Sequence, residues 1–187
     1  MSELGRIGYE RIFQHAPVGM CVSQHRVIHA CNEAMATMFR YPADTLAGQS
    51  FAMLYPTHAE FERLGARIVP IMNATGCYSD ERIMRRADGE LFWCHVSGRM
   101  LHSDAGTVDI WIFEDLSKKR PVTAQLTPRE REIAALLVEG KTSKLIAREL
   151  GLSPRTVEMH RAKLMRKFGA ATSSDLVNRI LNTQRQP

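Results

Sequence analysis

The sequence predicts two folded parts, an α+β domain built on one antiparallel sheet and an all-α domain of four helices. Strand-like and helix-like segments alternate over residues 1–116, and the last three strand-like segments follow one another directly. Residues 126–187 carry repeated helix start and stop signals and no alternating strand pattern. Runs of strands with flanking helices, followed by helices alone, indicate this fold class.

The first part opens with two strand-like segments, 19–24 and 27–31, which we expect to pair around His25 and Arg26. Asn32 then stands at a helix N-cap position, ahead of apolar residues at helical spacing over 33–39. These segments predict a hairpin that leads into a short helix.

A longer amphipathic helix is predicted over 57–76, where Pro70 is expected to kink or shorten it. The segments 77–87 and 90–101 then form a hairpin, because the Asp88-Gly89 pair between them favours a tight turn. The segment 108–115 alternates apolar and polar residues and closes the sheet.

The second part shows helix signals at each end of its segments. Thr127-Pro128-Arg129-Glu130 has the pattern of a capping box, and Gly140 is a natural stop. Ser143 is expected to cap a short second helix that ends at Leu150-Gly151, Ser153-Pro154 opens a third that runs to about Phe168, and Ser173 or Ser174 starts a fourth.

A basic triplet followed by Pro121 and small polar residues suggests a linker over 117–125. The expected domains are therefore 1–116, with an N-terminal helix, and 126–187. Residues 1–120 hold 13 Lys/Arg and 14 Asp/Glu, whereas residues 121–187 hold 12 and 6, a balance of +6. This asymmetry favours a nucleic-acid partner for the second part alone.

Four cysteines, Cys21, Cys31, Cys77 and Cys94, show neither a CxxC pair nor Cys/His metal spacing, so packed, reduced thiols are favoured over a redox or metal role. The longest apolar run, 133–138, has six residues, and the N-terminus shows no export signal. We expect a cytoplasmic protein with no membrane contact.

Only Gly151 and Leu152 separate the second helix from the cap of the third, which is helix-turn-helix geometry. On a helical wheel of the third helix, Val157, Leu164 and Phe168 share one face, and this face is expected to pack inward. The opposite face is basic with small or unbranched residues at its centre, which suits a DNA major groove. It consists of Arg155, Met159, Ala162 and Arg166, flanked by Glu158 and Lys163.

Residues 126 to about 181 resemble the LuxR/FixJ-type helix-turn-helix of bacterial regulators, through LTPRERE, Gly140, Ile146-Ala147 and SPRTVEMHR. The resemblance implies double-stranded DNA and RNA polymerase as partners, and a homodimer at least on DNA. The base-facing positions it implies are Glu158, Met159 and Ala162. The phosphate-contacting positions it implies are Lys144, Arg155, Thr156, Arg161, Lys163 and Arg166.

This chain departs from the family pattern at two positions, with Leu145 in place of Glu and Phe168 in place of Leu. Leu145 weakens the fit of the second helix slightly. The resemblance also implies a dimer contact through Leu176, Val177 and Ile180 on the fourth helix, although core packing explains these three residues equally well.

Residues 9–120 resemble a PAS domain, through YERIFQHAPVGMCV, VIHACNEAMATMFRY, RADGELFWCHVSG and DIWIFEDLSKKR. The resemblance implies a pocket for a small molecule, a cofactor or a partner between sheet and helices, and plain core packing without a cavity stays an equal alternative. Phe51 stands where a flavin photosensor needs a reactive Cys, so a flavin adduct is not expected. A capping or surface role for His58 is favoured over the alternative that His58 binds a haem iron. The expected pocket residues are Met20, Cys31, Met35, Met53, Ile83, Trp93, His95 and Met100.

The sequence therefore predicts a one-component transcription regulator in which a PAS sensor controls sequence-specific DNA binding. The alternative is an interaction module whose PAS domain docks a protein and whose helical part serves assembly. A nucleophile–base pair, a phosphate loop or a metal cluster is not apparent in the sequence, so an enzyme is not expected. The phospho-acceptor pattern of a receiver domain is likewise not recognisable.

Overall fold

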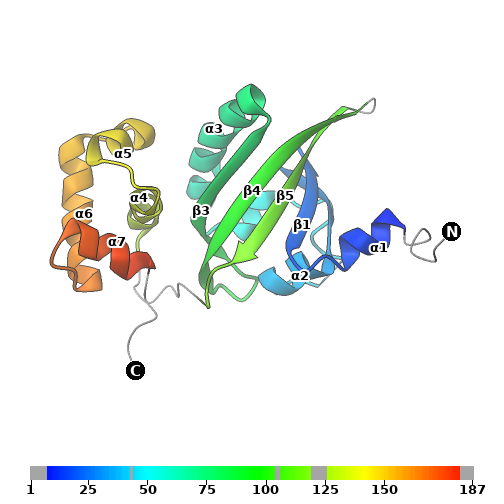
Figure 1. Cartoon of the computed structure of the whole chain (residues 1–187), viewed down its shortest axis with the longest axis horizontal. Coiled ribbons are helices and arrows are strands. Elements are labelled where there is room, and N and C mark those ends of the chain that lie inside the picture. The colour runs from blue at the N-terminus through cyan, green and yellow to red at the C-terminus, as the bar shows by residue number, and fades with distance from the viewer. Residues whose placement is uncertain (1–7, 43, 104–105, 119–125, 182–187) are drawn as a thin grey trace.

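The structure is a computed structural model that describes residues 8–42, 44–103, 106–118 and 126–181. An α+β domain and a helical domain lie side by side, with the helical domain against one edge of the sheet (Figure 1). Of the predicted linker, residues 119–125, including Pro121, fall outside these ranges. Within the described ranges, none of the helices has the length and apolar character that crossing a bilayer requires.

Within the residues that the structure describes, the α+β domain holds five strands and four helical segments, in agreement with the predicted fold class. In chain order they are α1 (Tyr9–Gln14), β1 (Gly19–Gln24), β2 (Val27–Cys31), α2 (Glu33–Phe39), the 3-10 helix η2 (Phe51–Leu54), α3 (His58–Thr75), β3 (Cys77–Arg85), β4 (Leu91–Ser103) and β5 (Gly106–Asp115).

All paired strands of the sheet are antiparallel, in the order β2-β1-β5-β4-β3. The predicted turn between β3 and β4 is confirmed, and Gly89 takes the left-handed conformation with φ 89°. Between β1 and β2 the chain turns through His25 and Arg26, which also have positive φ angles of 50° and 64°. Both hairpins predicted from the sequence are therefore present.

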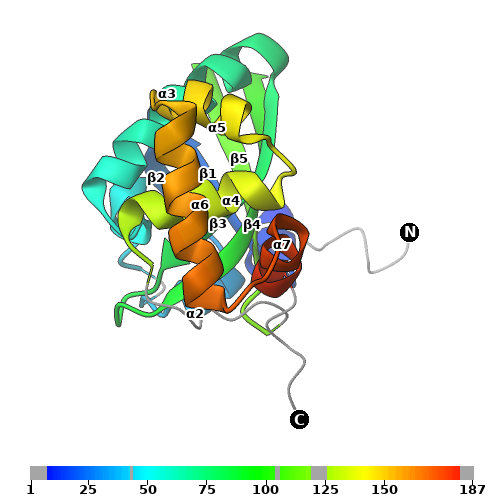
Figure 2. The ribbon, with the colours of Figure 1, turned by 90° about the vertical axis from the view of Figure 1, so that its left-hand side faces the viewer.

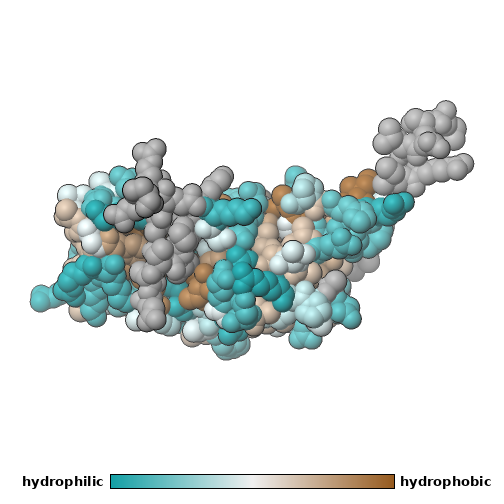
Figure 3. All heavy atoms as spheres, turned by 90° about the horizontal axis from the view of Figure 1, so that it is seen from below, coloured by the Kyte–Doolittle hydropathy of each residue, from teal (hydrophilic) through white to brown (hydrophobic). Residues whose placement is uncertain are grey.

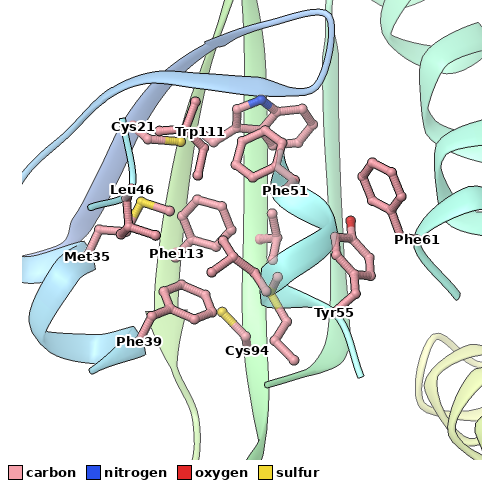
Figure 4. Packing of buried hydrophobic residues seen from close by; sticks show 14 of the residues in the cluster. Cys21, Met35, Phe39, Leu46, Phe51, Tyr55, Phe61, Cys94, Trp111 and Phe113 are labelled. Carbon is pink, nitrogen blue, oxygen red and sulfur yellow. The ribbon is translucent and has the colours of Figure 1, made fainter. Parts of the chain in front are cut away.

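The core of this domain lies between the helices and the inner face of the sheet. Its inward residues alternate along the strands, so that Phe92, Cys94 and Val96 of β4 are buried beside Trp111 and Phe113 of β5. Aromatic rings pack edge to face across this core (Figure 4). Such packing holds the sheet and the helices α2 and η2 together.

The expectation that Pro70 would shorten the long helix is wrong. The helix α3 runs unbroken from His58 to Thr75, with Thr57 as its N-cap and Gly76 as its left-handed C-cap. Pro70 lies on the exposed side of α3. There, the carbonyl that lacks the proline's N–H can bond to water instead, which lowers the cost of the missing helical bond.

The helical domain consists of four helices, as predicted: α4 (Pro128–Val138), α5 (Ser143–Leu150), α6 (Pro154–Phe168) and α7 (Ser173–Leu181). The capping box at the start of α4 is confirmed, because the Thr127 side chain accepts from the Glu130 amide and Glu130 accepts from the Thr127 amide. One cap differs from the prediction: Thr142, not Ser143, caps α5. Ser143 is instead the first helical residue and is buried.

The helical domain packs on the outer face of the sheet at the β3–β4 hairpin. Ile83 and Trp93 are cross-strand partners on this face, and both belong to the same apolar cluster as Ile133 and Leu136 of α4. The helix α4 lies against β3 in this arrangement. The two domains thus share one continuous apolar interface.

Candidate functional site: a reading helix and a cavity

The helix α6 lies on the side of the helical domain that faces away from the sheet (Figure 2). Val157 and Leu164 are fully buried beneath it and fix its rotation, as the helical wheel predicts. The opposite face is open to solvent along its length, and Met159 at its centre is 49% exposed. Arg155, Ala162 and Arg166 are exposed on the same face.

The turn before α6 is built by side chains that the sequence identified. Gly151 ends α5 in the left-handed conformation, with φ 62°. The Ser153 hydroxyl then accepts from the Thr156 amide at 3.1 Å and caps α6, while Pro154 occupies the first helical position. These contacts hold the N-terminus of α6 at a fixed angle to α5.

The side chains that the resemblance assigns to phosphate contacts differ in their exposure and in the hydrogen bonds that they already make. Lys144 on α5 is exposed, as are Arg155 and Arg166 on α6, and Lys163 is half-buried. Thr156 is half-buried beside the Ser153 hydroxyl. Arg161 is different: it donates to the hydroxyls of Ser143 and Ser173 and to the Glu158 carboxylate, which ties α5, α6 and α7 together.

The residues expected to form a dimer contact on the fourth helix lie mainly in the core. Leu176 and Ile180 are buried between α7 and the other helices, whereas Val177 is half-buried. Because Leu176 and Ile180 fill the interior of their own domain, they cannot also present a surface to a second copy. Of the three, Val177 alone keeps partial exposure.

The α+β domain contains a cavity of about 730 Å³ between α3 and the inner face of β1, β4 and β5. Aromatic rings dominate its wall, and Figure 4 shows Phe51 beside Trp111, and Tyr55 beside Phe61 of α3. This volume is typical of small-molecule sites. The wall also includes Ser23, Arg26, Ile68, Met72, Arg82, Met84, Met100, Asp109 and Phe113.

Of the eight expected pocket residues, Met100 is among those that line this cavity. The structure places Ile83 and Trp93 on the other face of the sheet, against α4. His95, two residues after Trp93 on β4, lies on that outer face too, near Ser79 at 3.4 Å. The error is one of strand parity, because neighbouring residues of a strand point to opposite faces.

The remaining four expected pocket residues, Met20, Cys31, Met35 and Met53, are buried or half-buried outside the lining of the cavity. Met35 is in the closed part of the core (Figure 4). Sequence reasoning missed Tyr55, Trp111 and Arg82. The signal that would have found Arg82 is its parity with Met84, which gives both residues the inner face of β3.

The two cofactor hypotheses concern Phe51 and His58. Phe51 contributes its ring to the cavity wall, at the position where a flavin adduct needs a thiol. His58 is exposed at the first position of α3, with its Nε2 3.8 Å from a Glu62 carboxylate oxygen, and it does not line the cavity. This location fits the surface role better than that of a haem ligand.

Arg82, which lines the cavity, forms a buried ion pair with Asp80 on the same strand, β3. The Arg82 guanidinium, 4% exposed, donates to the Tyr55 hydroxyl at 2.7 Å and to the Asp80 carboxylate at 2.7 Å. Burial alone would lower the pKa of Arg82, but Asp80 and Tyr55 raise it above its usual range. Arg82 therefore stays charged, and the neighbouring Asp80 balances that charge.

Ion pairs between α3 and the helical domain surround the apolar interface. Glu60 and Arg131, 3% and 7% exposed, form a two-pronged pair at 2.6 and 3.2 Å. Arg63 pairs with Glu132 on α4. Arg67 reaches Glu149 on α5 at 3.3 Å, so three basic or acidic positions one turn apart on α3 contact the helical domain.

Comparison with known protein families assigns both halves. Residues 17–118 match the family described as PAS domain, and residues 124–180 match bacterial regulatory proteins of the luxR family. The PAS match covers more than half of the chain.

Three relatives show how far the similarity extends. The PAS domain of a LuxR-family transcriptional regulator from Burkholderia thailandensis, solved in complex with ethanol, is 52% identical over 59% of this chain and 99% of that one, with a TM-score of 0.55. VqmA of Vibrio cholerae, solved as a ligand–DNA complex, is 25% identical over 95% of this chain and 88% of that one, with a TM-score of 0.50. A further structure shows VqmA bound to DPO, at 26% identity over 91% of this chain and 84% of that one, with a TM-score of 0.54.

The third relative is the sensor protein TdiS of Thauera aromatica, which is 30% identical over 139 residues. That match covers 74% of this chain but 25% of TdiS. The chain therefore spans about a quarter of the length of this curated relative, and the shared part is a module within a larger protein.

Proposed function

The chain belongs to the PAS-domain family and carries a LuxR-family helix-turn-helix, and from this premise we propose that it is a one-component transcription regulator. In this proposal the PAS cavity binds a small molecule and controls how α6 engages double-stranded DNA. VqmA, with the same order of domains, has been solved with a ligand and DNA together. Such a regulator works beside the chromosome, in the bacterial cytoplasm, with RNA polymerase as its further partner.

The observation that carries the proposal is the orientation of α6. The helix lies on the side of the helical domain away from the PAS domain (Figure 2), and Arg155 and Arg166 on its basic face are exposed. The PAS domain instead contacts α4 and the acidic positions Glu139 and Glu149. A major groove about 12 Å wide admits a helix presented in this way. The described residues therefore leave the proposed reading surface uncovered.

The base contacts proposed for this surface are those of Glu158, Met159 and Ala162, and the phosphate contacts are those of Lys144, Arg155, Lys163 and Arg166. Apolar Met159 and Ala162 suit the methyl group of thymine, and a carboxylate accepts from the amino group of cytosine. Arg161 is better suited to fix α6 against α5 and α7, since its guanidinium already donates to Ser143 and Ser173. We propose a homodimer on DNA.

The chemistry of the cavity favours an uncharged ligand with an aromatic or apolar body. Its rings come from Phe51, Tyr55, Phe61, Trp111 and Phe113, and the buried Arg82 of the wall is already balanced by the Asp80 carboxylate. A charged ligand would lose most of its hydration against these rings. The related Burkholderia domain, solved with ethanol, also holds a small neutral molecule.

The experiment is to select binding sites from a random duplex library and then measure affinity by fluorescence anisotropy over a range of salt. A steep decrease in affinity with salt is expected, with a slope of about −0.9 for each phosphate neutralised. Reversing Arg155 and Lys163 to Glu should weaken binding at least about hundredfold, because two attractive contacts become repulsive. Reversing the exposed Arg11 of α1 is the matched control, and its affinity should stay unchanged.

The hydropathy of the visible surface is compatible with this assignment. The face of the molecule seen in Figure 3 mixes hydrophilic and apolar side chains over both domains. Exposed apolar side chains are ordinary on a folded domain. If the selected duplexes bound the double charge reversal as tightly as the unchanged protein, the helical domain would be an assembly module and the proposal would be wrong.

A further inference from the structure

Arg82 lies where two hollow spaces meet. It lines the PAS cavity, and it also lines a second cavity of about 300 Å³ between the PAS domain and the helical domain. Asp80 and Arg67 line the second space but not the first. The neighbouring side chains of Arg82 and Asp80 on β3 therefore border both the ligand space and the space beside the helical domain.

One carboxylate, that of Asp80, is shared between two guanidinium groups. Its Oδ1 accepts from Arg82 at 2.7 Å, and its Oδ2 accepts from Arg67 at 2.8 Å and from the Tyr78 hydroxyl at 2.9 Å. Burial raises the pKa of Tyr78, and Asp80 raises it further, so Tyr78 keeps its proton and donates. Because the carboxylate is shared, a change in the strength of the Arg82–Asp80 interaction also changes the strength of the Asp80–Arg67 interaction.

Arg67 is in turn shared between the PAS domain and the helical domain. Its Nη2 donates to Asp80, while its Nη1 lies 3.3 Å from Glu149 and its Nη2 lies 3.8 Å from Glu139. The contacts to the helical domain are longer than the contact to Asp80, which makes them the weaker side of the balance. Arg67 can therefore shift toward Asp80 without leaving a charge unpaired.

We propose that Arg82, Asp80 and Arg67 form a relay that passes ligand occupancy of the PAS cavity to the contact of Arg67 with Glu139 and Glu149 in the helical domain. The relay rests on the proposed function, since it describes how the cavity controls the reader. A ligand atom that accepts from Arg82 competes with Asp80 for that guanidinium. Asp80 then holds Arg67 more strongly, Arg67 withdraws from Glu149, and the helical domain docks less tightly.

Two substitutions disturb the cavity end of the relay in opposite directions, and neither needs a known ligand. In Arg82→Met the Asp80 carboxylate interacts with Arg67 and Tyr78 without competition from Arg82. Asp80 should then hold Arg67 more strongly, so the helical domain should dock less tightly. Tyr55→Phe removes the other acceptor of Arg82, so Arg82 binds Asp80 more strongly and docking should tighten. In both variants every remaining buried charge keeps a partner of opposite sign.

The structure offers a matched pair of variants at the other end. Arg67 and Arg63 lie one turn apart on α3, and each pairs with an acid of the helical domain, but Asp80 contacts Arg67 and not Arg63. Arg67→Met leaves Glu149 paired with Lys141, and Arg63→Met leaves Glu132 paired with Arg129. Arg63→Met removes one interdomain pair and Arg67→Met removes two, and Arg67→Met alone cuts the relay.

Docking can be followed through Trp93, which is 3% exposed in the interface with α4. The chain has two tryptophans, so a Trp111→Phe background isolates the fluorescence of Trp93. Acrylamide quenching of Trp93 then reports how often the helical domain leaves the sheet. Mutations along a coupled network alter coupling by roughly twofold to thirtyfold, and we expect changes of that size.

The expected result is that Arg82→Met raises the quenching constant and Tyr55→Phe lowers it, both in the Arg63→Met background and without it. In the Arg67→Met background both effects should fall below about twofold. Equal effects in the Arg67→Met and Arg63→Met backgrounds would overturn the relay, because the signal would then bypass Arg67. Cooperative thermal unfolding checks each variant, and if Arg82→Met does not fold, Tyr55→Phe decides alone.

The same variants are titrated with the selected DNA duplex to separate this inference from the proposed function. If the unchanged protein does not bind the selected duplex, the proposed regulatory function is wrong. The quenching measurement tests the relay without DNA. Benzyl alcohol, a neutral aromatic molecule with one hydroxyl, serves as the ligand probe in calorimetry and quenching. An increase in Trp93 quenching that Arg67→Met abolishes supports the relay, and an increase that persists in Arg67→Met opposes it.

Discussion

The buried pair of Glu60 and Arg131 joins the PAS domain to the helical domain, so it offers a sharp test of how tightly the two are coupled. Arg131 donates to both carboxylate oxygens of Glu60 and to the Leu126 carbonyl at 2.6 Å. Thr57 also donates to Glu60 at 2.9 Å. Arg131→Met removes the cation and leaves the Glu60 carboxylate in a space closed by α3 and α4.

The cost follows from burial. Removing one partner of a buried ion pair costs about 3–5 kcal/mol, because the other charge loses its compensation while remaining out of water. Glu60 regains water once the helical domain swings away, so the cost falls on docking rather than on the PAS core. The docking equilibrium should therefore shift by roughly two to four powers of ten.

The assay is differential scanning calorimetry of the whole chain. The unchanged protein should unfold in one coupled transition, and Arg131→Met should show two separate transitions, one for each domain. The double variant Glu60→Met with Arg131→Met is the control, because replacing a buried pair by apolar groups of similar volume is close to neutral. A single unshifted transition in Arg131→Met, or a double variant no better than the single one, would refute the reasoning.

Three further predictions concern the fold that holds the two sites. A Cβ at Gly98 would overlap the ring of Trp111, so Gly98→Ala should destabilise the PAS domain by about 1–3 kcal/mol in thermal unfolding, and an unchanged melting temperature would contradict this packing. Thr127→Ala removes the cap of α4 and should cost about 1 kcal/mol in urea unfolding of the helical domain. Burial raises the pKa of Glu130, but Lys167 and Thr127 outweigh it and lower that pKa below its ordinary value. The stabilisation is therefore complete above the ordinary pKa of glutamate and is lost as pH falls through the folded value, so unfolding followed from about pH 6 to 3 should show stability decreasing on acidification, less so in Lys167→Met.

The helical domain was predictable in detail because its signals are local. A Thr-x-x-Glu capping box, two Ser or Thr caps and Gly at left-handed positions each act within a few residues of the chain. The wheel of α6 then needed only the helical period to separate Val157 and Leu164 from the exposed face. The shift of the α5 cap from Ser143 to Thr142 is the size of error that adjacent Ser and Thr residues allow, since either side chain can cap.

The cavity was harder to predict, because its wall depends on strand parity and on long-range register. Trp111 faces it because it shares its parity on β5 with Phe113, and the indole ring has room there because its cross-strand partner is Gly98. Neither the pairing nor the close approach is visible in a single strand. The relay between the domains was beyond sequence reasoning for the same reason, since Asp80, Arg82 and Arg67 meet only after β3 folds against α3.

Ile83 and Trp93 were wrongly predicted to line the pocket, but the sequence around them does indicate that both faces of this hairpin are covered. In β3 and β4, apolar residues stand next to each other, as Ile83-Met84 and Phe92-Trp93-Cys94, instead of alternating with polar ones. A strand with apolar side chains on both faces is expected to be covered on both faces. The inner face has its cover in the PAS helices, so the surplus on the outer face already required a second layer at this hairpin. The helix α4 supplies that layer, which places the helical domain on the back of the cavity wall, where a change in the wall can reach it.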